Sequence, residues 1–222
     1  MEATENGFVA VKCLACGLIY VNPRPSLSRI DDAVRTGAHS EHAGGLKVVG
    51  RRVPGKVARY KKIISQLFAD VLDRGSPISW LDVGAGFGEI VEAVSALASF
   101  GSHVEGLEPM KPKADVARAR GLSIREAYLN AIPPNQFDIV SVINVLSHLP
   151  DFRGFLEDVK KILSPNGEIL IETGNAGDLV DRSGFPGGVD ATRSLGIRRR
   201  VAHPPLPPRS RFRDCSDQTD AH

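Results

Sequence analysis

The stretch LDVGAGFGEI, residues 81–90, decides the fold class of this chain. It places Gly84, Gly86 and Gly88 directly after the apolar run ISWLDV (78–83) and directly before a helical pattern of apolar residues. A strand that runs into glycines and then a helix puts the glycines at the carboxyl edge of a sheet, where open α/β folds bind ligands. Gly84 and Gly86 can adopt positive φ and let a ligand approach the main chain, whereas Gly88 allows the helix to pack closely.

The segment around this loop, residues 51–178, alternates predicted strands and helices. Apolar runs predict further strands at 103–109, 122–124, 137–143 and 168–173, and helical periodicity predicts helices at 53–73, 90–98, 114–120 and 152–163. Such alternation implies a doubly wound, mostly parallel Rossmann-like α/β sheet with helices on both faces.

Composition and charge exclude several classes of protein. The chain has 222 residues, of which 42% are hydrophobic and 24% charged, so we expect one main globular domain. A formal net charge of +2 is too small to indicate a nucleic-acid partner. No apolar run reaches the roughly 18 residues of a membrane helix, and the start MEATENGF is not a signal peptide. We therefore expect a cytoplasmic protein without a membrane partner.

Two common nucleotide-binding motifs do not fit the glycine loop. The phosphate loop requires Lys and Ser or Thr after its last glycine, where this chain has Glu89 and Ile90. The dinucleotide fingerprint requires Gly or Ala at the position of Glu89, and a carboxylate there would face the pyrophosphate.

The sequence DVGAGFG, preceded by Leu81, resembles the first motif of the class I S-adenosylmethionine-dependent methyltransferases. The segment FDIVSVINVLSHLPD (137–151) is similar to that family's fourth strand and the loop after it, and LEDVKKILSPNGEILIETGN (156–175) to its turn and fifth strand. The resemblance covers residues 53–175. It implies S-adenosylmethionine as the cofactor and methyl transfer to an oxygen, nitrogen or carbon atom of a small-molecule acceptor.

The resemblance also implies roles for individual residues. Glu108, at the end of the second strand, would accept hydrogen bonds from the ribose hydroxyls, and Asp82 would help to hold the methionine part of the cofactor. His148 is the candidate general base, because it is the only histidine in the segment after the fourth strand. The expected cofactor-binding residues are Asp82, Gly84, Ala85, Gly86, Gly88, Glu108, Pro109, Glu126, Ala127, Asn144 and Val145.

The amino-terminal region, residues 1–50, is predicted to be a β-hairpin that carries Cys13 and Cys16, followed by loop. The C-x-x-C pattern is half of a zinc ribbon, and it resembles an element of a methyltransferase subgroup that has a second C-x-x-C upstream. His39 and His42 do not convincingly complete the site. Three explanations stay open: a missing upstream start, a zinc ion shared by two chains of a homodimer, or a hairpin without metal.

The carboxyl-terminal region, residues 179–222, is predicted to be a disordered tail. Residues 182–213 contain eight Arg, no Lys and five Pro, which argues against a packed strand or helix. One interpretation is that the native end was replaced, so that the last strands of the sheet are missing; the other is a natural tail whose RRR cluster binds an acidic surface. The first favours an alternative function, a non-catalytic cofactor-binding or interaction protein that has lost its acceptor site.

Overall fold

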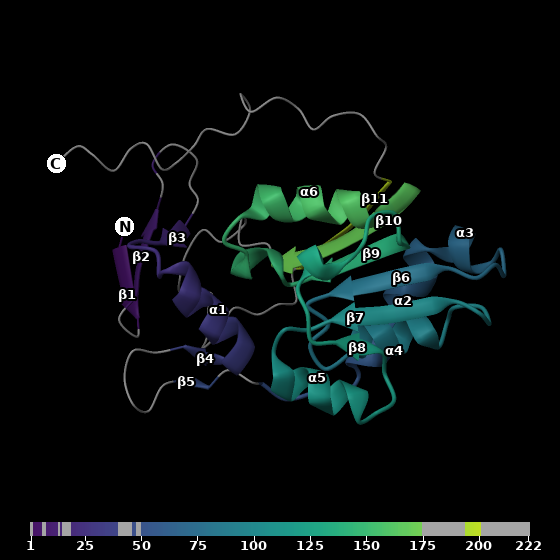
Figure 1. The fold of residues 1–222 in the computed structure, drawn as a ribbon, viewed down its shortest axis with the longest axis horizontal. Coiled ribbons are helices and arrows are strands. Elements are labelled where there is room, and N and C mark those ends of the chain that lie inside the picture. Colours follow the sequence, from purple (N-terminus) through teal and green to yellow (C-terminus); the bar gives the residue numbers. More distant parts are fainter. Residues whose placement is uncertain are drawn as a thin grey trace.

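A computed structural model of the chain describes residues 2–5, 8–12, 14, 19–39, 46–47, 50–174 and 194–200. Its centre is a six-stranded sheet with the strand order β11-β10-β9-β6-β7-β8 (Figure 1). The five strands β6 to β10 are parallel to one another, and β11 is antiparallel to β10. The bounds are β6 Ser79–Val83, β7 His103–Leu107, β8 Ile124–Arg125, β9 Phe137–Ile143, β10 Leu163–Gly174 and β11 Ser194–Arg200.

The order of the strands creates a topological switch point. From β6 the chain moves outward to β7 and β8, then crosses back to β9 on the other side of β6. Trp80 of β6 pairs with Ile139 of β9, and Val83 pairs with Val142. This arrangement confirms the predicted Rossmann-like fold, and it places the candidate ligand crevice at the carboxyl ends of β6 and β9.

The helices cover both faces of this sheet (Figure 1). They are α2 Lys56–Leu67, α3 Ala69–Leu72, α4 Glu89–Ser95, α5 Lys111–Arg118, the 3-10 helices η1 Leu129–Ala131 and η2 Leu146–His148, and α6 Phe152–Ile162. At the start of α6, the Asp151 carboxylate accepts a hydrogen bond from the main-chain nitrogen of Gly154, a side-chain cap.

The prediction of one continuous helix over residues 53–73 is wrong, because the structure has two helices there. The backbone of Phe68 leaves the helical region, with φ −119° and ψ 24°, and separates α2 from α3. The Phe68 ring is fully buried and lies edge-on to Trp80, with ring centroids 4.9 Å apart. We attribute the break to this packing, which outweighs the continuous helical pattern of the sequence.

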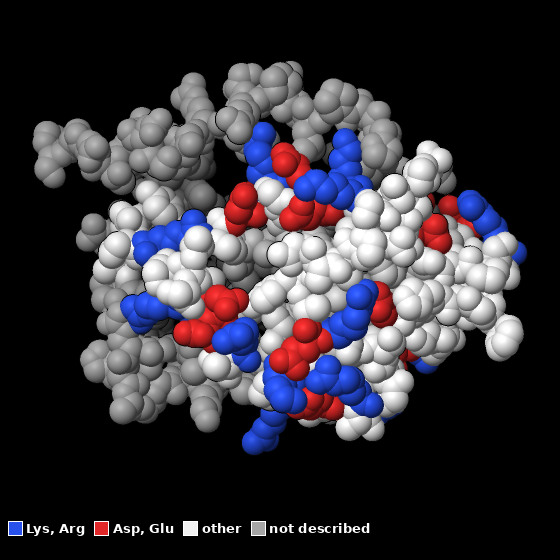
Figure 2. Space-filling view, in the orientation of Figure 1, with Lys and Arg blue, Asp and Glu red and all other residues white. Residues whose placement is uncertain are grey.

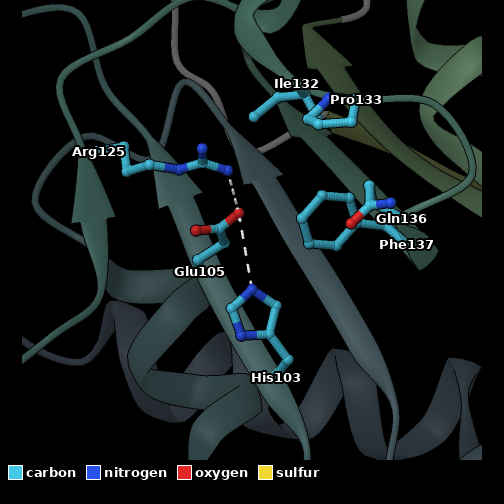
Figure 3. Close-up of a pocket in the computed structure, with 7 residues that line it drawn as sticks. All are labelled: His103, Glu105, Arg125, Ile132, Pro133, Gln136 and Phe137. Carbon is cyan, nitrogen blue, oxygen red and sulfur yellow. Dashed lines mark hydrogen bonds and ion pairs between the residues drawn. The ribbon is translucent and has the colours of Figure 1, made fainter.

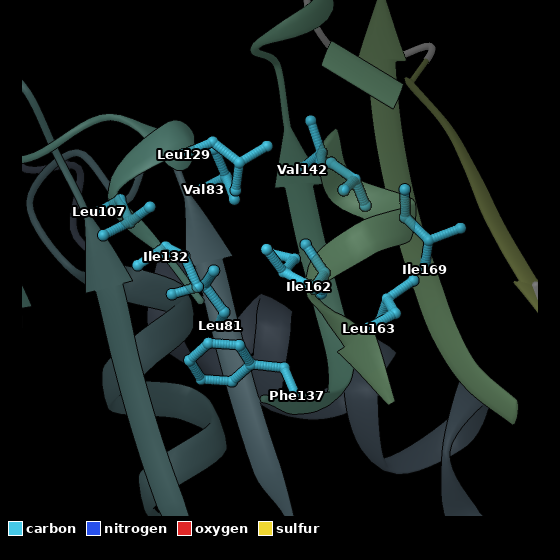
Figure 4. Packing of buried hydrophobic residues seen from close by; sticks show 12 residues of the cluster. Leu81, Val83, Leu107, Leu129, Ile132, Phe137, Val142, Ile162, Leu163 and Ile169 are labelled. Atoms are coloured by element: carbon cyan, nitrogen blue, oxygen red, sulfur yellow. The ribbon is translucent and has the colours of Figure 1, made fainter. Parts of the chain in front are cut away.

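Two large apolar clusters fill the space between the sheet and its helices. Figure 4 shows the cluster on the α6 face, in which Leu81, Val142 and Ile162 are members. On the other face, Ile64 of α2 and Val94 of α4 pack with the cluster that contains Trp80. Both faces of the parallel strands are therefore buried, as the nearly continuous apolar sequence of β9 predicts.

The described part of the amino-terminal region contains the predicted hairpin and four elements that were not predicted, β1, α1, β4 and β5. Strands β2 Phe8–Lys12 and β3 Ile19–Val21 pair antiparallel, and β1 Glu2–Glu5 adds to β2. The predicted loop contains helix α1 Leu27–Thr36 and the short strands β4 Ala38–His39 and β5 Leu46–Lys47, so that prediction is wrong. Ser26 caps α1 and Gly37 ends it with φ 70°, both common boundary signals. Cys13, Cys16 and His42 lie outside the described residues.

Strand β11 corrects part of the prediction for the tail. The sequence composition argues against any strand within 182–213, but Ser194–Arg200 pairs antiparallel with β10, from Gly174↔Ser194 to Glu168↔Arg200. The unpaired main-chain groups of β10 can accept any extended segment, whatever its composition, which is why composition alone fails here. Residues 179–193 and 201–222 of the predicted tail are outside the described part of the chain.

Charged side chains of both signs lie together on the face shown in Figure 2. In α5, Asp115 forms ion pairs with Lys111 at 2.8 Å and with Arg118, and in α6 Lys161 pairs with Asp158 at 2.8 Å. These local pairs leave mixed rather than single-sign charge over the two helices. Within the described residues, no helix has both the length and the apolar character needed to span a bilayer.

Candidate functional site

The glycine loop, defined as residues 84–88, connects β6 to α4 at the switch point. The main-chain nitrogens of Gly84 and Ala85 both donate hydrogen bonds to the carbonyl of Leu107, each at 2.8 Å, and so tie the loop to the end of β7. Gly84, Gly86 and Gly88 have φ values of 73°, 57° and 81°. The positive φ predicted for the first two is confirmed, and Gly88 shares it.

The three glycines differ in what surrounds them. A Cβ on Gly84 would lie 2.4 Å from Val145 Cγ2, and one on Gly88 would lie 2.5 Å from Leu122 Cδ1. The Cβ position of Gly86 has only Glu89 Oε2 within 4 Å among the described residues, at 3.9 Å. Gly84 and Gly88 therefore allow close packing, whereas Gly86 borders open space that a ligand can use.

Glu108 is fixed against the glycine loop. It follows β7, is 6% exposed, and accepts hydrogen bonds from the main-chain nitrogens of Gly86 at 2.6 Å and Met110 at 2.9 Å. A carboxylate offers about four lone-pair sites, so two acceptor sites stay available after these bonds. The structure thus places the predicted ribose-binding acid beside the predicted loop, with acceptor capacity for a diol.

Asp82 lies beneath the loop, in β6, and is 2% exposed. Its Oδ1 accepts a hydrogen bond from the Ser141 hydroxyl at 2.6 Å, and that hydroxyl in turn accepts one from Trp80 Nε1 at 2.9 Å. The pKa of Asp82 is raised to about 7: burial is the largest cause, the Ser141 hydrogen bond lowers the pKa, and the charges of Glu108 and Glu89 raise it. A cation beside Asp82 would stabilise its ionised form.

Glu89, the first residue of α4, is a site residue that the sequence did not reveal. In the sequence, Glu89 serves only as an argument against a dinucleotide-binding loop. In the structure it is 6% exposed, and its Oε1 is buried without a hydrogen-bond partner among the described residues. The one available signal in the sequence is a carboxylate immediately after the glycine loop. Its burial is unusual, because Glu side chains are almost never fully buried without a partner.

The other predicted cofactor residues divide into two groups. Val145 contacts the glycine loop at Gly84, Pro109 follows Glu108, and the Ala85 methyl packs with Val91 and Ala114, so that Ala85 can offer a ligand only its main chain. The remaining ones lie at the rim. Glu126 is exposed and pairs with Arg118 at 3.6 Å. Ala127 packs against the α6-face cluster, and Asn144 is exposed with φ 54°. The candidate base His148 is also exposed and lies in η2.

Tyr128 links this rim to the amino-terminal region. Its hydroxyl donates a hydrogen bond to the Asp31 carboxylate in α1. Burial, followed by the hydrogen bond and charge of Asp31, raises the pKa of Tyr128 to about 12. Figure 1 shows α1 on the side of the sheet toward which the strands point, so α1 lies near the candidate crevice.

A separate cavity of about 390 Å³ lies over the first residues of β7 and β9 (Figure 3). Its centre is Glu105, which pairs with Arg125 and lies 3.7 Å from His103 Nε2, while the His103 ring stacks on Phe137. His103 begins the strand that Glu108 follows, so this cavity is at the opposite end of β7 from the glycine loop. The Glu105 carboxylate is already paired with Arg125, and we assign the cavity no role in the candidate site.

The family model described as "Methyltransferase domain" matches residues 51–217. The chain belongs to this family. Ubiquinone biosynthesis O-methyltransferases of Aeromonas salmonicida and Idiomarina loihiensis are 30% and 33% identical to this methyltransferase domain, each over 104 residues. Each match covers 43% of this chain and 42% of the relative, so it spans less than half the length of these curated relatives.

Solved methyltransferase structures are also similar to this methyltransferase domain. The plantazolicin methyltransferase BpumL, in complex with a monoazolic desmethylPZN analogue and SAH, aligns with a TM-score of 0.45 and 17% identity, covering 55% of this chain and 49% of that one. A Mesorhizobium loti S-adenosylmethionine-dependent methyltransferase aligns with a TM-score of 0.41 and 24% identity, covering 49% and 54%.

S-adenosylmethionine is the cofactor that the family assignment supports, and the residues present fit it. The cofactor carries two cationic groups, a sulfonium and an ammonium, and the site gathers the buried carboxylates of Asp82, Glu89 and Glu108. Open space at Gly86 and an unpartnered oxygen on Glu89 are the features that a cationic ligand would complete. No group of three or more His, Cys, Asp or Glu that could hold a metal occurs among the described residues, which do not include the predicted zinc ligands Cys13 and Cys16.

Proposed function

We propose that this chain binds S-adenosylmethionine at Asp82, the glycine loop and Glu108, and transfers its methyl group to a small-molecule acceptor. The observation that carries the proposal is the Glu108 carboxylate, which two main-chain nitrogens hold at the switch point beside Gly86. Ligands of open α/β folds bind at this place in the sheet.

Each residue has a defined task in this proposal. Glu108 accepts hydrogen bonds from the ribose hydroxyls through the lone pairs that Gly86 and Met110 leave available. Asp82, oriented by Ser141, provides negative charge for the methionine end. When bound, the sulfonium supplies an activated methyl group, so the protein contributes mainly in-line positioning of the acceptor.

We further propose an acceptor atom and a base. The curated relatives are named as O-methyltransferases, which favours oxygen over nitrogen or carbon as the acceptor in this chain. An oxygen acceptor must lose a proton, and the exposed His148, which follows β9 in η2, has a side chain whose ordinary pKa suits that transfer. Replacement of His148 by Ala should abolish turnover and leave cofactor affinity unchanged. Unchanged turnover in His148→Ala would exclude His148 as the general base.

Zinc at Cys13 and Cys16, and a homodimer that shares it, stay proposals on the sequence alone. Structural zinc sites use four protein ligands, so one chain with two thiolates requires a second. Elemental analysis of purified protein, combined with its mass in solution, tests this: half a zinc per chain in a dimer supports sharing, and metal-free protein excludes it.

Calorimetric titration with S-adenosylhomocysteine tests the cofactor site, with NAD as the control ligand. Asp82→Ala and Glu108→Ala should each weaken binding at least about tenfold, which corresponds to about 1.4 kcal/mol. Asp158→Ala, which removes an exposed acid of α6, is the matched control and should bind like the wild type. Equal affinity in all variants would falsify the site assignment, and binding without methyl transfer to any acceptor would favour a non-catalytic protein.

A further inference from the structure

We propose that Glu89 is an additional cofactor-binding residue, whose carboxylate is the counter-charge of the cofactor's sulfonium. The site would then prefer S-adenosylmethionine to its neutral-sulfur product, S-adenosylhomocysteine. The inference rests on the proposed function and adds a residue and a selectivity to it.

The first observation is that Glu89 lacks a partner for a buried oxygen. Its Oε1 is buried and forms no hydrogen bond with the described residues, and the whole residue is only 6% exposed. An unpartnered buried polar group is costly, and a carboxylate more so. A cation that arrives with the ligand would provide the missing interaction.

The second observation is the neighbourhood of this oxygen. The charges of Glu89 and Glu108 both act on the buried Asp82, so three carboxylates share one region of low exposure. Like charges at short range destabilise one another in the absence of a cation. The described residues of this region place no Lys or Arg in an ion pair with any of the three.

A purely structural role for Glu89 explains less. Acidic residues in the first turn of a helix interact favourably with its dipole, but by only about 0.3–1 kcal/mol at exposed positions. Glu92, the other acid in the first turn of α4, is an ordinary example: it is partly exposed and pairs with Arg52 at 3.0 Å and with Arg120. Glu89 is buried, and although its charge acts on Arg120, that guanidinium forms its ion pair with Glu92 and not with Glu89.

The geometry favours the sulfonium over the ammonium as the partner of Glu89. Glu89 Oε2 lies 3.9 Å from the Cβ position of Gly86, and the nitrogen of Gly86 donates to Glu108, the proposed ribose acid. In the cofactor, the sulfur is bonded directly to the ribose methylene carbon, whereas the ammonium lies three carbons farther along the chain. The cation nearest to the ribose is therefore the sulfonium.

The test compares the dissociation constants of S-adenosylmethionine and S-adenosylhomocysteine, measured by calorimetry without acceptor. The two ligands differ by one methyl group and one positive charge. In Glu89→Gln, affinity for S-adenosylmethionine should fall about tenfold, while affinity for S-adenosylhomocysteine stays nearly constant. Glu92→Gln, which removes a carboxylate from the same helical turn, should leave the ratio of the two constants as in the wild type.

Thermal unfolding of the ligand-free protein separates binding from folding. Glu89→Gln should be at least as stable as the wild type, because it removes a buried charge that has no partner. A large loss of stability would overturn the inference, as would equal weakening of both ligands or an unchanged ratio. If the wild type binds neither ligand, the proposed function fails as well, whereas wild-type binding with an unchanged ratio in Glu89→Gln overturns this inference alone.

Discussion

The Glu108 carboxylate accepts a hydrogen bond from the main-chain nitrogen of Gly86 at 2.6 Å, across a separation of 22 residues. This bond joins the glycine loop after β6 to the end of β7, and two further bonds from Gly84 and Ala85 to Leu107 strengthen the connection. The loop conformation is thus held by the protein itself. Cofactor binding then does not have to supply the free energy that ordering the loop would cost.

Replacement by alanine should mainly weaken cofactor binding at Gly86 and mainly reduce stability at Gly88. Both positions require positive φ, which costs about 1–2 kcal/mol for a residue with a Cβ. At Gly88 the new methyl group would also collide with Leu122, so we expect the larger loss of unfolding free energy there. At Gly86 the methyl group would enter the open space beside Glu89 and weaken cofactor binding at least about tenfold. Denaturant titration should show the larger loss of unfolding free energy in Gly88→Ala, and calorimetry should show the larger loss of cofactor affinity in Gly86→Ala. The reverse result in both measurements would contradict the assignment of open space to Gly86.

The stability of the ligand-free protein should depend on pH through Asp82. Its pKa rises from 3.8 to about 7 on folding, so between these values the folded chain holds a proton that the unfolded chain has released. Folding is therefore favoured at the acidic end, and this contribution is lost as the pH rises to about 7. The Tm of the wild type should fall relative to that of Asp82→Asn across this window. Parallel Tm curves would show that Asp82 does not titrate there.

The affinity for the cofactor should change in the opposite sense. Because a bound cation stabilises the ionised carboxylate, binding of S-adenosylmethionine should strengthen as the pH rises through about 7, the pKa of Asp82. Asp82→Asn should remove this dependence. Calorimetric titrations at several pH values, in buffers of different ionisation enthalpy, would measure both the affinity and the proton released.

Loss of Arg59 should destabilise the fold more than loss of an exposed ion pair. Arg59 of α2 pairs at 3.0 Å with Glu172, which is buried at the end of β10. Arg59→Ala leaves that carboxylate without this partner, and we expect a loss of about 1–3 kcal/mol in unfolding free energy. Lys161→Ala, which breaks the exposed pair with Asp158, should change it by less than about 1 kcal/mol. Similar losses in the two variants would mean that Glu172 finds another partner.

Removal of β11 should make the protein prone to aggregation. A chain that ends at residue 193 exposes the edge of β10, whereas one that ends at residue 200 keeps the antiparallel pairing. Light scattering of the two truncated proteins at equal concentration should show association only in the shorter one. If both remain monomeric, the β10 edge is protected without β11.

Sequence patterns were most informative where one physical factor dominates. The strand at 137–143 was predicted at its observed bounds because both faces of β9 are buried, which requires continuous apolar residues. Asp82 and Glu108 are predicted from the resemblance to the methyltransferase motifs, and the structure has Asp82 as the last residue but one of β6 and Glu108 directly after β7. The break at Phe68, the pairing of β11 and the burial of Glu89 depend on residues distant in the sequence, and no local pattern reports them.

Helix α1 was missed for a different reason. Its boundary signals, Ser26 and Gly37, are present in the sequence, and Leu27, Ile30 and Val34 recur at helical spacing, so the loop prediction overlooked local signals. The contact that ties it to the site, between Asp31 and Tyr128, spans 97 residues. Such a contact follows from the tertiary fold alone.

The chain contains a single tryptophan, and its indole belongs to the hydrogen-bonded series Trp80–Ser141–Asp82. The ring is fully buried, so its emission reports on this interior environment rather than on solvent. Any event that changes the charge of Asp82 is two hydrogen bonds from the fluorophore. The protein thus carries a built-in optical probe, through which occupancy of the crevice can be followed by fluorescence without a label.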